Sequence, residues 1–181
     1  MASSLIVALV VFWRNCIGLV IRPYETCRRI AEKASYFELL FIGILVALVK
    51  FPGFYTYCLV VVLFWGLGHL LGSKTSLKGL AILWGYSLMP TTIWFLVTLL
   101  LSVVLPPPRT TSMQGTLFSV VFLIFSMTML FWKGTITYLT LRFGLKLGLG
   151  KILLVLGITL PILALYSMEM YTLGIFKIPF I

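Results

Sequence analysis

The sequence is poor in the side chains that enzymes and metal sites use. Its 181 residues include no aspartate, four glutamates and a single histidine, His69. One histidine cannot hold a metal without thiols or carboxylates beside it, and four glutamates offer few pairs for acid–base catalysis. The three cysteines are widely separated and form no CxxC pair, so they indicate neither a disulfide framework nor a zinc site. We therefore expect a protein that is not an enzyme and uses no cofactor or metal.

Charge of either sign is also scarce. Only 10% of the residues are charged and 61% are hydrophobic, whereas a soluble domain carries about 25% charged residues. This composition excludes the soluble, disordered and nucleic-acid-binding classes of protein. Apolar stretches about 20 residues long recur along the chain, as they do in multi-pass membrane proteins. The stretches are too long for barrel strands and do not alternate as such strands must.

Hydropathy predicts an all-α, polytopic membrane bundle over residues 36–181. Five transmembrane helices are expected, over about 36–49, 55–71, 77–105, 115–141 and 152–168. Pro90 lies in the middle of the third and should kink it. Gly68 and Gly72 form a small-xxx-small pair, which predicts a close contact between helices.

The first 35 residues form a separate N-terminal segment with two possible arrangements. In one, residues 4–21 are a sixth span, and Arg14 costs roughly 2.5–3.5 kcal/mol if it lies near the membrane centre. In the other, this stretch lies in the interface, with Trp13 and Arg14 at the level of the headgroups. We favour the interfacial arrangement.

A basic helix follows this stretch. Pro23 suits the first turn of a helix over residues 24–34, because its missing N–H is not needed there. The basic side chains of this helix are expected to face anionic lipid headgroups; they are Arg22, Arg28, Arg29 and Lys33. The alternative is a docking surface for a cytosolic partner.

The basic residues also predict the topology. With five spans, ten of the fourteen fall in the N-terminal segment and in the loops 72–78 and 142–151. Only Lys50, Arg109 and Lys177 fall on the other side, and Lys133 lies within the fourth span. Because cytoplasmic loops carry the excess of lysine and arginine, the N-terminus is predicted to be cytoplasmic and the C-terminus outside.

Lys133 is the most unusual charge in the chain. It precedes Arg142 by nine residues, so it lies ~13 Å from the helix end. An ionisable residue at that depth is a functional-site hypothesis. Two structural alternatives are snorkelling to the headgroups and pairing with Glu38 at the end of the first span. His69, near the end of the second span, is interpreted as an interfacial polar residue.

Two glycine-containing segments are candidate binding or packing sites. Residues 144–151, GLKLGLGK, resemble a phosphate-binding loop only superficially, since they lack its spacing and its preceding strand. Gly85 and Ser87 cluster with two threonines around Pro90, where hydroxyl groups can satisfy the carbonyl that a kink frees. This stretch is predicted to be a packing hub against the first or fifth span, and the alternative is a cavity lining.

Two motifs resemble a known family. The stretch from Gly85 through Tyr86 to Pro90, GYSLMP, looks like the Gly-Tyr…Pro signature of the Yip family of Ypt/Rab-interacting proteins. RPYETCRRIAEK, over residues 22–33, resembles the lead-in of the prokaryotic members. The resemblance covers roughly residues 15–170. It implies five spans, a cytoplasmic N-terminus and no enzymatic activity.

The sequence departs from the eukaryotic members of that family. They carry a long polar N-terminal tail with an Asp-Leu-Tyr-Gly-Pro-like segment, and this chain has neither the tail nor any aspartate. Binding of a small GTPase is therefore not expected, and a prokaryotic cell membrane is the predicted location.

Two classes of function remain open. The favoured one is a protein that organises the membrane or recruits partners, with anionic lipids, other membrane proteins or a second copy as its contacts. The alternative is a transporter or channel component for an ion or small molecule, which Lys133 and the broken third span support. The lack of an inverted repeat and of intramembrane acids stands against transport.

Overall fold

The chain is all-helical, as the sequence predicts. The computed structural model describes residues 2–33, 36–49, 51–104 and 113–175, and no strand occurs in these ranges. The helices are α1 (Ala2–Ile21), α2 (Pro23–Glu32), α3 (Tyr36–Val49), α4 (Phe51–Leu70), α5 (Leu77–Ser87), α6 (Met89–Val104), α7 (Met113–Leu139) and α8 (Leu149–Thr172). A π-helical turn, Thr140–Gly144, continues α7.

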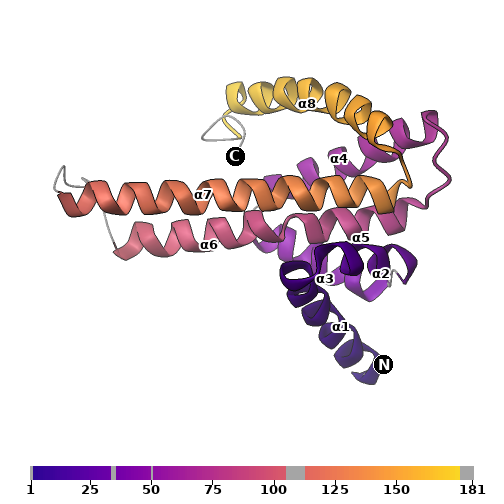
Figure 1. Ribbon diagram of the computed structural model, residues 1–181, viewed down its shortest axis with the longest axis horizontal. Helices are drawn as coiled ribbons and strands as arrows, with labels where there is room; N and C mark the ends of the chain where they lie inside the picture. The colour runs from indigo at the N-terminus through magenta and orange to yellow at the C-terminus, as the bar shows by residue number, and fades with distance from the viewer. Residues whose placement is uncertain (1, 34–35, 50, 105–112, 176–181) are drawn as a thin grey trace.

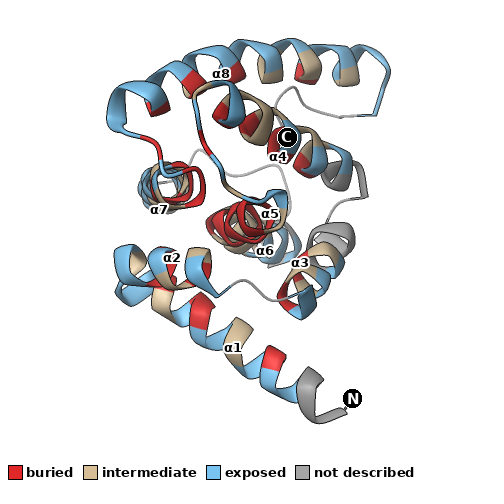
Figure 2. Cartoon of the chain, turned by 90° about the vertical axis from the view of Figure 1, so that its right-hand side faces the viewer, coloured by how far each residue is buried: buried red, intermediate tan, exposed pale blue. Residues whose placement is uncertain are grey.

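Helix α5 is the centre of the bundle. It packs against α2, α3, α4 and α7, which surround it in the view along the long axis (Figure 2). Every residue from Gly79 to Ser87 is buried. Helices α6 and α7 pair with each other and extend beyond this centre as a hairpin (Figure 1).

Among the described residues, three helical stretches are long and apolar enough to cross a membrane, which supports the membrane class. They are Leu77–Leu101, Gly115–Gly144 and Leu149–Thr172. The apolar stretches Ile6–Ile21 and Tyr55–Leu70 are shorter, and α3 has only 14 residues. The predicted count of five spans is therefore not confirmed.

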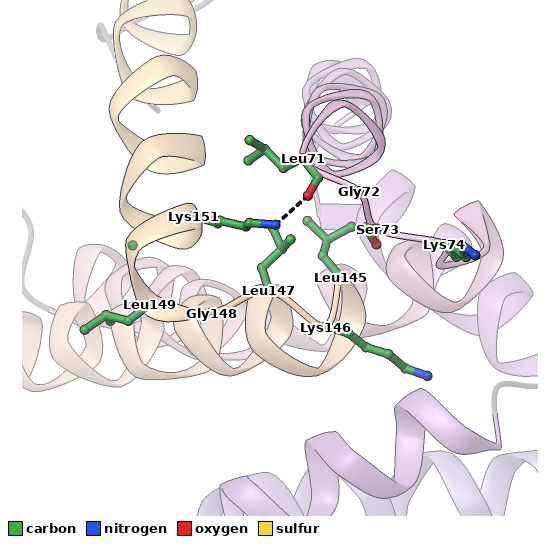
Figure 3. A pocket seen from close by; sticks show the side chains of 11 residues that line it. Leu71, Gly72, Ser73, Lys74, Leu145, Lys146, Leu147, Gly148, Leu149 and Lys151 are labelled. Carbon is green, nitrogen blue, oxygen red and sulfur yellow. Dashed lines mark hydrogen bonds between the residues drawn. The ribbon is translucent and has the colours of Figure 1, made fainter.

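The loops 72–78 and 142–151 lie together at one end of the bundle. Residues 71–74 and 145–151 line one pocket between them (Figure 3). Helix α2 contacts the π-helical turn and α5, so its basic residues approach the same part of the fold. Lys50, Arg109 and Lys177, which the sequence predicts for the other end, lie outside the described residues.

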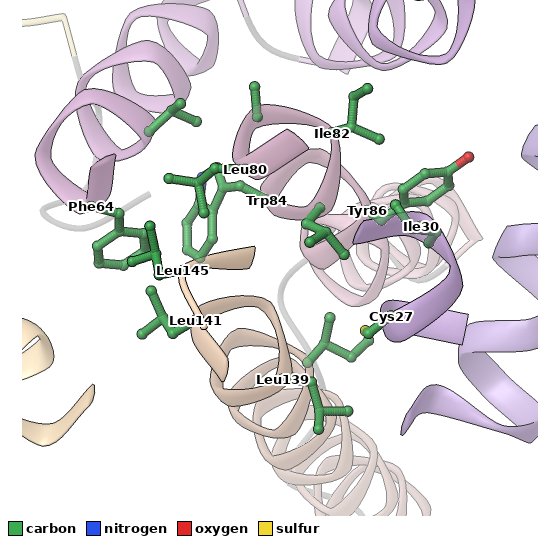
Figure 4. Packing of buried hydrophobic residues seen from close by; sticks show 14 of the residues in the cluster. Cys27, Ile30, Phe64, Leu80, Ile82, Trp84, Tyr86, Leu139, Leu141 and Leu145 are labelled. Atoms are coloured by element: carbon green, nitrogen blue, oxygen red, sulfur yellow. The ribbon is translucent and has the colours of Figure 1, made fainter. Parts of the chain in front are cut away.

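The apolar core joins α2, α4, α5 and the end of α7. Figure 4 shows its side chains, among them Ile30, Phe64, Leu80 and Leu141. The rings of Phe64 and Trp84 meet edge to face, with their centroids 5.0 Å apart. Large apolar side chains on α7 such as Leu123 and Phe131 are instead exposed, as expected for a surface that meets lipid.

The predicted break at Pro90 is confirmed. Helix α5 ends at Ser87 and α6 begins at Met89, because proline has no N–H and cannot complete the preceding turn. Hydroxyl groups bind carbonyl oxygens on both sides, as expected. Ser87 Oγ donates to Trp84 O at 2.7 Å, and Thr92 Oγ1 donates to Leu88 O at 3.1 Å.

Two of the three glycines expected at helix contacts are found there. A Cβ on Gly85 would collide with Cγ2 of Ile42, so α5 packs closely on α3, the first predicted span. A Cβ on Gly68 would lie 2.7 Å from Leu145 Cδ2, so α4 packs closely on the residue that follows the π-helical turn, and a larger residue at this position would force the leucine to shift. The expectation for Gly72 was wrong. This residue has φ +89° and a Cβ on it would meet no atom within 4 Å, so it serves the turn after α4.

Candidate functional site

Pro23 makes α1 and α2 a helical hairpin. Helix α1 is continuous through the polar residues Arg14 and Asn15 and ends at Ile21. Pro23 then occupies the first position of α2, where its fixed φ favours the helix. Helix α2 buries Cys27 and Ile30 on its inner face. In Figure 1 α1 runs across the direction of α6 and α7 rather than along it.

Four polar side chains connect this hairpin to the bundle. We call them the polar anchor: Asn15, Arg29, Glu38 and Tyr86. Arg29 Nη2 donates to Asn15 Oδ1 at 2.9 Å, and Asn15 Nδ2 donates to the Tyr86 hydroxyl at 3.3 Å. That hydroxyl in turn donates to Glu38. Each residue comes from a different helix, namely α1, α2, α3 and α5.

The polar anchor is buried and incompletely satisfied. Asn15, Glu38 and Tyr86 are each at most 3% exposed. Glu38 Oε2 and Arg29 Nε have no hydrogen-bond partner among the described residues. A buried carboxylate is costly without a compensating charge, and the Tyr86 hydroxyl together with the positive charges of Arg14 and Arg29 offsets only part of the cost of burying Glu38. The anchor therefore favours one fixed position of the hairpin.

Three of the four predicted lipid-facing residues are exposed. Arg22, Arg28 and Lys33 lie on the outer side of the hairpin, and we call them the basic face. Arg22 pairs with Glu25 at 3.5 Å, and Arg28 pairs with Glu32 at 3.3 Å. Exposed pairs of this kind contribute about 0–1 kcal/mol each, so a lipid phosphate can compete for the arginines.

The expectation for Arg29 is corrected by the structure. Its side chain is partly buried and turns inward to Asn15 instead of facing lipid. Successive residues on a helix point about 100° apart, and Arg29 lies one turn after the buried Thr26 and next to the buried Ile30, on the side of α2 that faces the bundle. Arg29 belongs to the polar anchor and not to the basic face.

An apolar row on α1 accompanies the basic face. Trp13, Ile17, Val20 and Ile21 are each 57–69% exposed. The segment 14–33 carries five basic and two acidic residues, a net charge of +3. Exposed apolar side chains beside positive charge are the features of a helix that lies at a membrane interface.

Lys133 makes a different contact from the one predicted. Its Nζ donates to Ser87 O at 2.8 Å and to Ser87 Oγ at 3.1 Å, and it lies 4.4 Å from the ring centroid of Trp84. The ammonium group thus meets the carboxyl end of α5, the negative end of that helix dipole. It is held inside the bundle, which argues against snorkelling.

The predicted pair between Lys133 and Glu38 is wrong. Lys133 belongs to α7 and Glu38 to α3, and these helices lie on opposite sides of α5 (Figure 2). The two residues meet neighbouring positions of α5, Ser87 and Tyr86, which point in different directions. Sequence position predicted their depth, but it carried no information about which side of α5 each would occupy.

His69 lies at the surface near the end of α4. Its Nδ1 is 3.2 Å from Trp65 O, and its ring packs 4.4 Å from the Trp65 ring, centroid to centroid. This is the placement expected for an interfacial polar residue. Within the described ranges, no three residues of the types His, Cys, Asp and Glu lie close enough together to hold a metal ion.

Sequence reasoning missed Asn15 and Ser87 as parts of these clusters. In the sequence Asn15 stands out only as an interruption of an apolar run, although an amide at that position needs a partner when the run is buried. Ser87 was expected to serve its own helix, and it also accepts the Lys133 ammonium. Both residues are at most 3% exposed.

The fold and these clusters define an all-helical protein with helices long and apolar enough to cross a membrane. No protein-family model matches the sequence, and no match is found among curated proteins or solved structures. The resemblance to the Yip family therefore stays a prediction.

Cys27 offers a direct measure of how firmly the hairpin is docked. It is 1% exposed, and burial raises the pKa of its thiol to about 12. Because the thiolate is the reactive form, a variant with Cys27 as its only cysteine should react with maleimide at least about tenfold slower than the unfolded chain at pH 7.5. Substituting Tyr86→Phe, which removes the link to Glu38, should accelerate the reaction. Equal rates in both folded proteins would show that the polar anchor does not hold the hairpin.

Proposed function

We propose that this chain is a non-enzymatic integral membrane protein that organises anionic lipid at the cytoplasmic face through its α1–α2 hairpin. One observation carries the proposal: the basic face and the apolar row lie on a hairpin that the polar anchor fixes to the bundle. The resemblance to prokaryotic members of the Yip family agrees with it. The location is then a prokaryotic cell membrane, with the N-terminus in the cytoplasm.

Two interactions, one electrostatic and one hydrophobic, favour binding of the hairpin to such a membrane. Each lysine or arginine near an anionic surface contributes about 1 kcal/mol, so the three residues of the basic face contribute on the order of 3 kcal/mol. The apolar row adds the burial of Trp13 and its neighbours at the headgroup boundary. Since the hairpin is docked on α5, lipid bound to it is held at a fixed place on the protein.

The experiment compares two triple variants that lose the same charge. The purified chain is placed in nanodiscs that contain a mixture of phosphatidylglycerol and phosphatidylcholine, and the lipids retained after transfer to detergent are counted by native mass spectrometry. Substituting Arg22, Arg28 and Lys33 by glutamine should lower the retained phosphatidylglycerol several-fold. The control substitutes Lys50, Arg109 and Lys177, which the sequence predicts for the other face, and should change it little. An equal loss in both variants, or no loss in either, would reject the proposed role of the hairpin.

A second function is favoured by the contact of Lys133. Broken helices whose carboxyl ends bind cations recur in transporters, and Lys133 places an ammonium at such an end. An ion flux into proteoliposomes that disappears with Lys133→Met would favour transport over the organising role.

A further inference from the structure

We propose that a pocket between two loops binds the phosphate of an anionic phospholipid headgroup. The loop pocket has a volume of about 610 Å³ and is formed by residues 71–74, after α4, and residues 145–151, before and within the start of α8 (Figure 3). This size is within the range of about 300–1,000 Å³ that is usual for small-ligand sites. The pocket is separate from the α1–α2 hairpin.

The lining of the loop pocket carries positive charge and no negative charge. Lys74, Lys146 and Lys151 contribute to it, and none of its eleven lining residues is acidic. The Lys151 side chain reaches from α8 to the other loop, where its Nζ donates to Leu71 O at 2.8 Å (Figure 3). An ammonium group has three hydrogens, so Lys151 can also donate to a phosphate without giving up this bond.

Backbone groups can support the same ligand. Gly148 caps α8, and no side chain bonds to the first turn from that position. Gly148 and Gly150 both line the pocket, and a Cβ on either would meet no atom within 4 Å. The first turn of α8 therefore faces the pocket without bulky neighbours, and amide groups at a helix start favour an anion. The N-terminus of α8 thus supplements the binding site that the loop pocket and its lysines form.

The loop pocket explains why the sequence pattern alone was misleading. Residues 144–151 lack the strand and the spacing of a nucleotide-binding loop, and they form no such loop here. The rest of the pocket lining comes from a segment some 70 residues earlier in the chain, which includes Ser73 and Lys74. The arrangement suits a phosphate group of any phosphate monoester or diester, without contacts that would select a nucleoside.

The surroundings favour a lipid as the source of that phosphate. Leu70 is 83% exposed, Leu149 is 58% exposed and Leu153 is 60% exposed, and they lie next to or within the pocket-lining segments. Acyl chains can cover these side chains while the headgroup enters the pocket. Both loops also lie at the ends of apolar helices, and in a bilayer that these helices cross the loops would lie near the headgroups.

The test measures lipid binding by the full chain in detergent, with native mass spectrometry as the readout. Phosphatidylglycerol is titrated against the protein, and phosphatidylcholine and inorganic phosphate form two further arms. The variant Lys146→Gly with Lys151→Gln should weaken phosphatidylglycerol binding at least about tenfold, since two positive charges are removed from residues that line the pocket. Lys146 has φ +55°, so glycine at this position should also relieve backbone strain.

A control outside the pocket and a second pocket variant keep the result interpretable. Lys78→Gln removes one lysine that lies over the Tyr36 ring and does not line the pocket, and it should leave affinity within about twofold. If Lys151→Gln disturbs folding, Lys74→Gln with Lys146→Gly leaves the Lys151–Leu71 bond intact and should still weaken binding several-fold.

Three results would overturn the proposal. One is unchanged affinity in both pocket variants. Another is equal affinity for phosphatidylcholine, which would mean that net negative charge is not recognised. The third is displacement of phosphatidylglycerol by millimolar inorganic phosphate, which would assign the pocket to a soluble phosphate. The triple variant of the basic face lowers total phosphatidylglycerol binding if the proposed function holds, but the further loss caused by Lys146→Gly with Lys151→Gln should be the same in that background as in the wild type. The pocket and the proposed function of the hairpin can therefore fail independently.

Discussion

Replacing Gly85 with leucine is expected to destabilise the protein by about 3 kcal/mol or more, because even the first added carbon collides with Ile42. Both residues are buried, and α5 is enclosed by four helices, so neither α3 nor α5 can move away without breaking other contacts. The expected result is a large fall in melting temperature in detergent, with aggregation when the variant is expressed at growth temperature.

Two companion variants test the cause of this loss. Gly134→Leu introduces the same side chain on α7, where a Cβ would meet no atom within 4 Å, and should change the melting temperature little. Gly85→Ala should be destabilising alone and should be partly rescued by Ile42→Ala, since residues in contact show coupled effects. A Gly85→Leu protein that melts with the wild type would mean that α3 and α5 do not pack at this point.

Substituting Lys133→Met should cost about 1–3 kcal/mol, because it leaves the carbonyl of a fully buried residue, Ser87, without its ammonium donor. Methionine preserves most of the apolar stem, so the loss reports on the charge and the hydrogen bonds. Lys133→Arg should restore little. The planar guanidinium is larger than an ammonium group and presents its donors in a fixed fork, whereas the contact lies between Ser87 and the Trp84 ring.

A double-mutant cycle separates this contact from the rejected ion pair. Lys133→Met and Glu38→Gln touch different clusters, so their losses in stability should add to within about 0.5 kcal/mol. Each variant is unfolded thermally in the same detergent and compared with the double variant. If the double variant recovered stability relative to either single one, Lys133 and Glu38 would be paired after all.

The sequence predicted local features of the fold well. The break near Pro90, the hydroxyl group of Ser87 beside it and the close approach at Gly85 all follow from covalent geometry and side-chain size. These properties act within one helix or between a glycine and whatever packs on it. These features can be predicted without knowing which helix packs against the residue. For Gly85, the sequence allows both the first and the fifth predicted span as the neighbour.

The contacts between distant residues were predicted less well. Lys133 and Glu38 have compatible depths, and only the position of α5 between α3 and α7 keeps them apart. Arg29 and Arg28 are adjacent and carry the same charge, yet the pairing with Asn15 buries one of them. The loop pocket depends on two segments some 70 residues apart. Each of these features is set by how the helices pack in three dimensions, which hydropathy does not encode.

The number of spans is hard to predict for a physical reason. Helix α3 has 14 residues, which at 1.5 Å per residue is ~21 Å, less than the ~30 Å of a bilayer core. A prediction from hydropathy counts such a helix as a transmembrane span because its residues are apolar. Whether it crosses depends on its neighbours in the bundle, and so on the tertiary fold.

The α6–α7 hairpin has a consequence for the kind of bilayer that suits this protein. The stretch Gly115–Gly144 has 30 residues and is ~45 Å long, well beyond the thickness of an average hydrocarbon core. In a bilayer, a helix of this length is accommodated by tilting, kinking or local thickening of the bilayer, and α6 would follow α7 because Trp94 Nε1 donates to Ser126 Oγ at 2.9 Å. Lys133 of α7 is hydrogen-bonded to Ser87 at the end of α5, so the inclination of the hairpin is coupled to α5, and a thick bilayer fits the long helix with less tilt than a thin one.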